Sequence, residues 1–160
     1  MHFRKTETLL AEGRTVNDGR NIIYLPDHRP KGACSMKIHL ETGAGANIIR
    51  AYGVGLITIN EQTYARSLVL MPDRILDPWG PARVAELGLQ DFMQIAELRP
   101  ELVLLGTGLR QRFPDPAMTR PLIEARIGME VMDTAAACRT YNILMGEGRR
   151  VAAALMMIEG

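Results

Sequence analysis

The second half of the chain alternates between helix-period segments and short apolar runs. One helical face is indicated by four apolar residues at spacing i, i+3, i+4 and i+7: Leu89, Phe92, Met93 and Ala96. Pro100 ends that segment, because the residue before a proline disfavours helical backbone. Residues 102–105 are then continuously apolar, which is typical of a strand covered on both faces of a sheet. The order predicts a helix followed by a central strand.

Two more strands and another helix are predicted after this point. Residues 129–132 form a short apolar strand, and Gly128 before them has the residue type of a helix C-cap. Asp133 is a suitable N-cap for a helix from Thr134 to about Met145. Residues 151–158 lack polar alternation, so we expect a last strand in the middle of the sheet.

The segment between the two strands leaves alternatives open. Asp115 and Pro116 have the residue types of an N-cap and a first helical position. Pro121 conflicts with one regular helix from there, since its ring would clash with the preceding turn. Either the helix begins later, or it kinks at Pro121.

The first half is β-rich. Residues 57–60 alternate, Glu61 and Gln62 form a turn, and residues 64–70 continue as a β-type segment, which predicts a hairpin. We expect Trp79, the only tryptophan, to pack as a lid over the core. Strands first and alternating strands and helices later predict an α/β fold: a single domain of three layers, with a mixed central β-sheet and helices packed on it.

Residues 1–35 differ from the rest and are predicted to be an N-terminal extension of a single domain formed by residues 36–160. They hold six basic and four acidic residues, several glycines and prolines, and one short apolar cluster at 22–25. Three alternatives stay open: a poorly ordered arm, a folded arm that covers a sheet edge, or a misassigned start, with translation beginning at Met36.

Composition and charge narrow the class of protein. An apolar fraction of 47% and a charged fraction of 23% are ordinary globular values and argue against disorder of the whole chain. The net charge of +1, without runs of like charge, argues against a nucleic-acid partner. No apolar stretch reaches the ~18 residues of a membrane span, and no secretory signal is visible. Together with only two cysteines, Cys34 and Cys138, these features predict a cytoplasmic protein without stable membrane insertion.

Common catalytic motifs are absent from the sequence. It has no G-x-S-x-G, P-loop, H-E-x-x-H or paired C-x-x-C motif, and its three histidines lack metal-ligand spacing. Gly106-Thr107-Gly108 resembles the start of a dinucleotide fingerprint, but Gln111 stands where the third glycine belongs. Cys138 lies among alanines, which favours a buried small side chain over a nucleophile. We therefore expect no metal site and no cofactor, and a non-enzymatic role is favoured over an enzymatic one, which stays open.

One candidate ligand site follows from the predicted strand order. If strands 102–105 and 129–132 are parallel, residues 106–113 and the start of the next helix line one crevice, where a helix N-terminus favours an anion. Arg139 leans toward that end of the helix, with Asn142 on the same face. The candidate ligand-binding residues are Gly106, Thr107, Gly108, Asp133, Thr134, Arg139 and Asn142. The alternative is structural: Asp133 is a plain cap, and Arg139 pairs with Glu130 or Asp133.

Several runs of the late half together resemble the signature of the Mth-type domain of unknown function. These runs are residues 104–108, 113–116, 128–134, 136–142 and 147–149. A weaker likeness extends back to about Met36 through residues 51–53, 59–60 and 67–68. This family contains the mitochondrial respiratory complex I assembly factor three. The resemblance implies a compact three-layer α/β domain with a mixed central sheet and no established enzymatic activity. Its matching residues here include Gly106, Thr107, Gly108, Asp133, Arg139 and Asn142, with no agreed role.

Three functional hypotheses follow. The first is a non-enzymatic interaction protein, with unknown protein partners, that helps to assemble a respiratory or other membrane-associated complex. The second is a small anionic-ligand-binding protein or enzyme that uses the crevice near Thr107, Asp133 and Arg139. The third is a stable dimerising domain that forms a homodimer.

Overall fold

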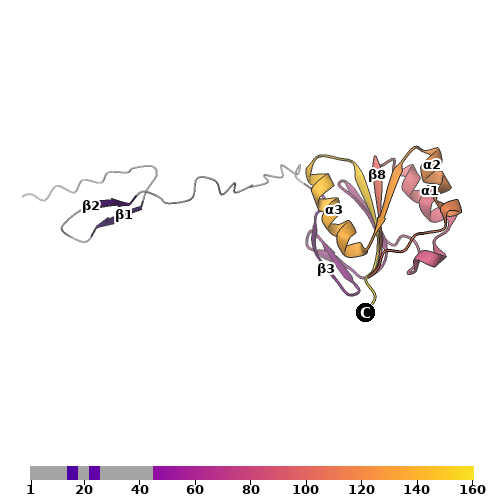
Figure 1. Cartoon of the computed structure of the whole chain (residues 1–160), viewed down its shortest axis with the longest axis horizontal. Helices are drawn as coiled ribbons and strands as arrows, with labels where there is room; N and C mark the ends of the chain where they lie inside the picture. The colour runs from indigo at the N-terminus through magenta and orange to yellow at the C-terminus, as the bar shows by residue number, and fades with distance from the viewer. Residues whose placement is uncertain (1–13, 18–21, 26–44) are drawn as a thin grey trace, which may run out of the picture. The chain divides into compact units, whose positions relative to one another are not determined.

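The chain divides into two compact units, residues 1–39 and residues 40–160. The computed structural model describes residues 14–17, 22–25 and 45–160 (Figure 1). In the first unit the described residues form an antiparallel hairpin of β1 (Arg14–Asn17) and β2 (Ile22–Leu25), so the apolar cluster of the extension is a strand. The domain boundary at residue 36 and the three alternatives for the extension stay predictions, and Met36 lies outside the described residues.

A five-stranded mixed sheet forms the centre of the second unit. Its order is β7 (Arg74–Leu76), β6 (Leu68–Met71), β10 (Val151–Met156), β8 (Leu102–Thr107) and β9 (Gly128–Met132). The strands β10, β8 and β9 are parallel to one another, whereas β6 and β7 are antiparallel to their neighbours. The predicted mixed sheet and the central position of the last strand are confirmed, although this strand ends at Met156 and not at the expected residue 158.

Both faces of this sheet are covered, which gives the predicted three layers (Figure 1). On one face Ala152, Ala154 and Met156 of β10 belong to the core under α1 (Leu89–Glu97) and α2 (Arg120–Glu124). On the other face Val151, Ala153 and Leu155 belong to the core under α3 (Thr134–Gly146). Every residue of β10 is therefore buried, and the strand needs no polar alternation.

A smaller antiparallel sheet shares the α3 side of the central sheet. It consists of β3 (Ile49–Gly53), β4 (Leu56–Ile59) and β5 (Gln62–Tyr64), and Ile57 and Ile59 are part of the core that holds Tyr141. The predicted hairpin is present, but its turn lies at residues 60–61 instead of 61–62, because Gln62 already pairs with Ile59 as the first residue of β5.

The continuous strand predicted over residues 64–70 is wrong. The chain leaves the small sheet after Tyr64 and enters the central sheet at Leu68, so β5 and β6 belong to different layers. Ser67 marks the crossing: its hydroxyl donates to the Pro81 carbonyl at 3.0 Å and its own carbonyl accepts from the Trp79 N–H at 2.9 Å. Trp79 is buried in the core, as expected.

The helices correct two details of the sequence-based interpretation. Asp115 caps a short 3₁₀ turn, η2 (Pro116–Thr119), by accepting from the Ala117 N–H at 2.9 Å. The α-helix α2 begins only at Arg120, so Pro121 lies in its first turn and the later start is the correct alternative. The expected C-cap at Gly128 is wrong, because α2 ends at Glu124 and Gly128 already begins β9.

The described residues contain no helix with the length and hydropathy that a bilayer crossing requires.

Candidate functional site

The carboxyl ends of the three parallel strands meet at one edge of the central sheet. Parallel pairing sets Thr107 of β8 opposite Met156 of β10, and Gly106 opposite Met132 of β9. Asp133 and α3 follow directly after β9. The predicted convergence of strand ends and helix N-terminus is confirmed.

Thr134, the first residue of α3, is fully buried and forms hydrogen bonds with two other segments at this edge of the sheet. Its hydroxyl donates to the Met156 carbonyl at 2.7 Å and accepts from the Gly108 N–H at 2.8 Å. Its backbone N–H donates to the Gly108 carbonyl at 2.9 Å. The start of α3 is thus fixed to the end of β10 and to the loop after β8.

Gly106 allows α3 to approach the sheet at this point. A Cβ atom on Gly106 would lie 3.0 Å from the Thr134 Cα atom and 3.1 Å from the Ala137 Cβ atom. Such distances are shorter than ordinary van der Waals contact, so a side chain at position 106 would push the helix away. Ala137, a small residue of α3, also serves this close packing.

Thr107 shapes the loop that follows β8. Its Oγ1 atom lies 2.9 Å from the Arg110 carbonyl and 3.0 Å from the Met132 carbonyl, and accepts from the Arg112 N–H at 3.0 Å. Gly108 has a φ of 89°, which a glycine adopts without strain. The Thr107 hydroxyl is therefore engaged within the protein, and it orients residues 108–112 around a pocket.

Asp133 is the N-cap of α3. Its Oδ1 atom accepts from the Ala136 N–H at 2.8 Å, as the structural alternative predicts. The Thr134 N–H donates to the Gly108 carbonyl. The N–H groups of Thr134 and Ala136, two donors that an anion at the helix N-terminus would use, are therefore already engaged.

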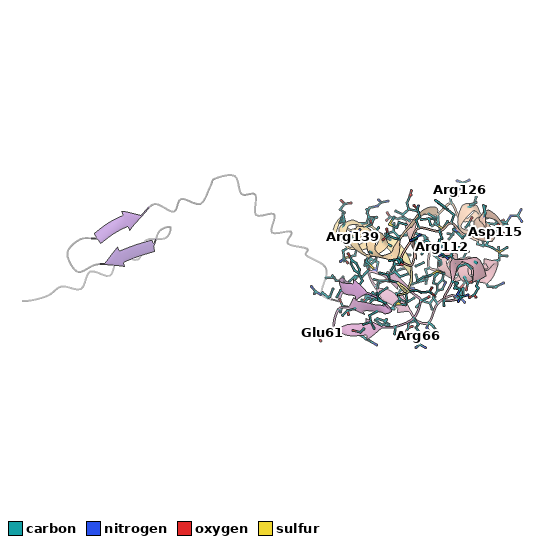
Figure 2. The ribbon with its side chains drawn as sticks, turned by 60° about the horizontal axis from the view of Figure 1, so that its bottom comes forward. Glu61, Arg66, Arg112, Asp115, Arg126 and Arg139 are labelled. Atoms are coloured by element: carbon teal, nitrogen blue, oxygen red, sulfur yellow. The ribbon has the colours of Figure 1, made fainter. Side chains whose placement is uncertain are left out.

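Arg139 and Asn142 lie on one face of α3, as expected, and both form hydrogen bonds with the small sheet. The Arg139 Nη1 atom donates to the Tyr52 hydroxyl at 2.8 Å, and Figure 2 shows Arg139 and Arg112 on separate parts of the surface. The Asn142 amide accepts from the Ile49 N–H at 3.0 Å and donates to the Ile49 carbonyl at 2.7 Å. Asn142 thereby bonds the backbone of β3, and it belongs to the packing of α3.

The ion pair expected between Arg139 and Glu130 or Asp133 does not form among the described residues. The Tyr52 hydroxyl, which accepts from the guanidinium, is the main cause that raises the pKa of Arg139.

Cys138 is buried in the core beneath α3, as expected for a small hydrophobic side chain. Burial raises the pKa of its thiol to about 12 from an ordinary value of 9.0. Because the thiolate is the nucleophilic form, this cysteine is protected from reaction in the folded protein.

We expect a variant with Cys34→Ser to react slowly with a thiol reagent near pH 8 when folded and rapidly in concentrated guanidinium chloride. Rapid labelling of the folded variant would contradict this prediction.

The raised pKa of Cys138 also has a consequence for stability. Between an unfolded value of 9.0 and a folded value of about 12, the unfolded chain loses the thiol proton first, so the free energy of unfolding should fall as pH rises through this window. Denaturant titrations across that pH window, compared with those of Cys138→Ala, would measure this fall in the free energy of unfolding.

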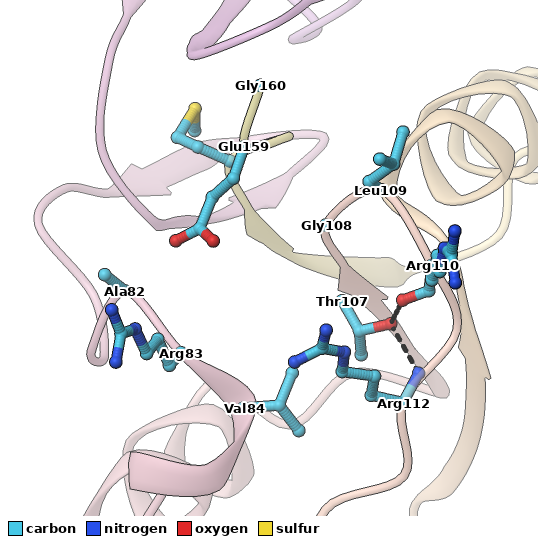
Figure 3. A pocket seen from close by; sticks show the side chains of 11 residues that line it. Ala82, Arg83, Val84, Thr107, Gly108, Leu109, Arg110, Arg112, Glu159 and Gly160 are labelled. Carbon is cyan, nitrogen blue, oxygen red and sulfur yellow. Dashed lines mark hydrogen bonds between the residues drawn. The ribbon is translucent and has the colours of Figure 1, made fainter.

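A cavity of about 400 Å³ opens at the carboxyl edge of the sheet, beside the loop that Thr107 organises (Figure 3). Its lining includes Thr107, Gly108, Leu109 and Met157, and its charged residues are Arg83, Arg110, Arg112 and Glu159. Figure 3 shows the Arg112 guanidinium and the Glu159 carboxylate turned toward the middle of the cavity. We call this cavity the arginine pocket.

The charged side chains that line the arginine pocket are mostly basic. Arg83, Arg110 and Arg112 line it together with Glu159, and Gly160 lines it as well. Among the described residues none of these arginines is in an ion pair. A second cavity of about 290 Å³ also includes Glu159, together with Arg66, which pairs with Asp77 at 3.0 Å.

The sequence patterns predicted the position of this edge but only some of the residues that line its pocket. Thr107 and Gly108 line the pocket, and Arg110 and Arg112 fall in the segment predicted to form a crevice. Arg83 and Glu159 were missed, since they come from the start of η1 (Val84–Glu86) and from the segment after β10. A ligand-binding role for the seven candidate residues stays a prediction.

The family of the chain is shown by its likeness to known proteins. The family model described as "Protein of unknown function (DUF498/DUF598)" matches residues 49–156, which is more than half of the chain. The chain belongs to the DUF498/DUF598 family. This is the Mth-type domain family that the sequence motifs indicate, and it includes the complex I assembly factor 3 proteins.

Relatives of this DUF498/DUF598 chain include an assembly factor and solved bacterial structures. NADH dehydrogenase (ubiquinone) 1 alpha subcomplex assembly factor 3 of Danio rerio is 29% identical over 76% of this chain and 71% of its own length. A crystal structure from Bordetella parapertussis is 40% identical, with a TM-score of 0.67 over 72% of this chain and 98% of its own. A Bordetella pertussis protein described as a Mth938-like domain is 34% identical, with a TM-score of 0.65 over 72% of this chain and 89% of its own.

Proposed function

We propose that this DUF498/DUF598 chain is a non-enzymatic interaction protein that helps to assemble a respiratory or other membrane-associated complex. The observation that carries the proposal is the likeness to the assembly factor of Danio rerio, which spans 76% of this chain. A second relative with the same name, from Xenopus tropicalis, is 31% identical over 68% of this chain and 60% of its own length.

The chemistry of the sheet edge supports a binding role. The hydroxyl groups of Thr107 and Thr134 and the carboxylate of Asp133 all bond the protein's own backbone. These groups therefore serve the fold. The side chains that remain available at this edge are arginines, Glu159 and exposed apolar residues, and arginine beside apolar surface is typical of recognition surfaces.

Deletion of the gene in its native host is the test of this proposal. We expect less of a fully assembled respiratory complex on native gels, together with accumulation of a smaller subcomplex, and recovery of both on expression of the full chain. An unchanged content of every respiratory complex in the deletion strain would contradict an assembly function.

A small anionic ligand is a second candidate, favoured by the arginine pocket itself. The residues that would hold it are Arg83, Arg110 and Arg112, in place of the Arg139 expected from the sequence. Thermal-shift screening with phosphates and small carboxylates separates this candidate from the first, because a ligand at 100 times its dissociation constant adds about 2.7 kcal/mol to stability.

The expected homodimer stays a prediction. Sedimentation velocity, which measures the mass of the protein in solution, tests it.

A further inference from the structure

The arginine pocket has a charge pattern that calls for a partner with carboxylates. Among the described residues, the ion pairs involve Arg66, Arg74, Arg120 and Arg149, none of which lines the arginine pocket. The pocket gathers three other arginines beside one glutamate, and none of these three is in an ion pair. Arginine presents a planar set of donors that matches a carboxylate with two parallel hydrogen bonds.

The loop backbone argues against a phosphate cradle. Phosphate sites in loops use several free backbone N–H groups that point at the ligand. Here the Gly108 N–H donates to the Thr134 hydroxyl at 2.8 Å, and the Arg112 N–H donates to the Thr107 hydroxyl at 3.0 Å. Two N–H groups of the loop are therefore engaged within the protein, which favours recognition by the arginine side chains.

Apolar side chains accompany the charge. Leu109 lines the pocket and is 64% exposed, and Phe113 on the same loop is 75% exposed. Apolar surface beside arginine is the composition of protein–protein interface cores, whereas small polar anions gain nothing from it. An occupant that contacts both needs carboxylates and an apolar residue in one segment.

We propose that the arginine pocket binds an acidic peptide segment of a partner protein, with carboxylates at Arg83, Arg110 and Arg112 and an apolar side chain against Leu109. This inference rests on the proposed interaction function and names the chemistry of the partner. The chain's own extension is a poor occupant, because residues 1–35 hold six basic against four acidic residues. Glu159 opposes acidic segments and so limits which of them bind.

The test is selection of random peptides on the immobilised full chain, followed by fluorescence anisotropy of the selected peptides. We expect them to be enriched in aspartate, glutamate and large apolar residues. The variant Arg83→Gln/Arg112→Gln should weaken their binding about tenfold or more. The variant Glu159→Gln should strengthen it, since it removes the opposing charge. The control Arg120→Gln changes an exposed arginine of α2 away from the pocket and should leave binding unchanged.

Other outcomes overturn the inference. Selected peptides without acidic enrichment, equal loss with Arg120→Gln, or no selected binder would each reject the acidic partner. An Arg112-dependent thermal shift with inorganic phosphate, without peptide binding, would assign the pocket to a small anion instead. An assembly defect on gene deletion that the double arginine variant fully rescues would reject this docking site and leave the proposed function standing.

Discussion

Gly106→Ala should lower the free energy of unfolding by about 1–3 kcal/mol, the range of overpacked buried sites. The added methyl group would lie 3.0 Å from the Thr134 Cα atom, which is backbone and cannot rotate away. Relief requires a shift of α3, and that shift lengthens the hydrogen bonds that Thr134 makes to Gly108 and Met156. Urea denaturation monitored by circular dichroism measures the loss.

Gly53→Ala is the matched control for this change. Gly53 lies in β3 without a left-handed φ, and a Cβ atom added to it would meet nothing within 4 Å. A methyl group there meets neither a steric nor a backbone obstacle, so stability should change by less than about 0.5 kcal/mol. Equal effects of the two substitutions would show that the contact between Gly106 and α3 is not what limits side-chain size.

Much of the fold follows from local sequence pattern. The continuous apolar run of β10 indicates burial on both faces, and the buried Ala152 and Ala153 have neighbours on opposite sides of the sheet. Asp133 identifies the start of α3 because a capping carboxylate acts over three residues. Signals of this kind are contained in adjacent positions, and the structure confirms them.

The site was less predictable, because its partners are distant in sequence. Helical geometry alone turns Arg139 toward the start of α3, but Tyr52, 87 residues away, accepts its hydrogen bond. Asn142 likewise bonds Ile49 across 93 residues. Arg83 and Glu159 reach the pocket from segments outside the strands that define the edge. No local pattern records these contacts, which depend on how the small sheet and the segments beyond the strand ends pack.

Thr134→Val should lower the free energy of unfolding by about 2–4 kcal/mol, because one substitution leaves two buried backbone groups without partners. Valine keeps the shape of threonine but removes the hydroxyl that joins the Gly108 N–H to the Met156 carbonyl. Thr134 is 0% exposed, so water cannot replace these bonds. Loss of the bridge should also loosen residues 108–112, which faster amide hydrogen exchange in that segment would report.

Two further substitutions separate the bridge from other effects of changing a threonine. Thr134→Ser keeps the hydroxyl and removes only a methyl group, so it should retain most of the stability that Thr134→Val loses. Thr63→Val removes a hydroxyl from the exposed pair that Thr63 forms with Thr58 at 3.0 Å, and it should change stability by less than about 0.5 kcal/mol. If Thr134→Ser were as destabilised as Thr134→Val, packing of the methyl group would outweigh the hydroxyl bridge, and the edge that shapes the arginine pocket would depend on side-chain volume.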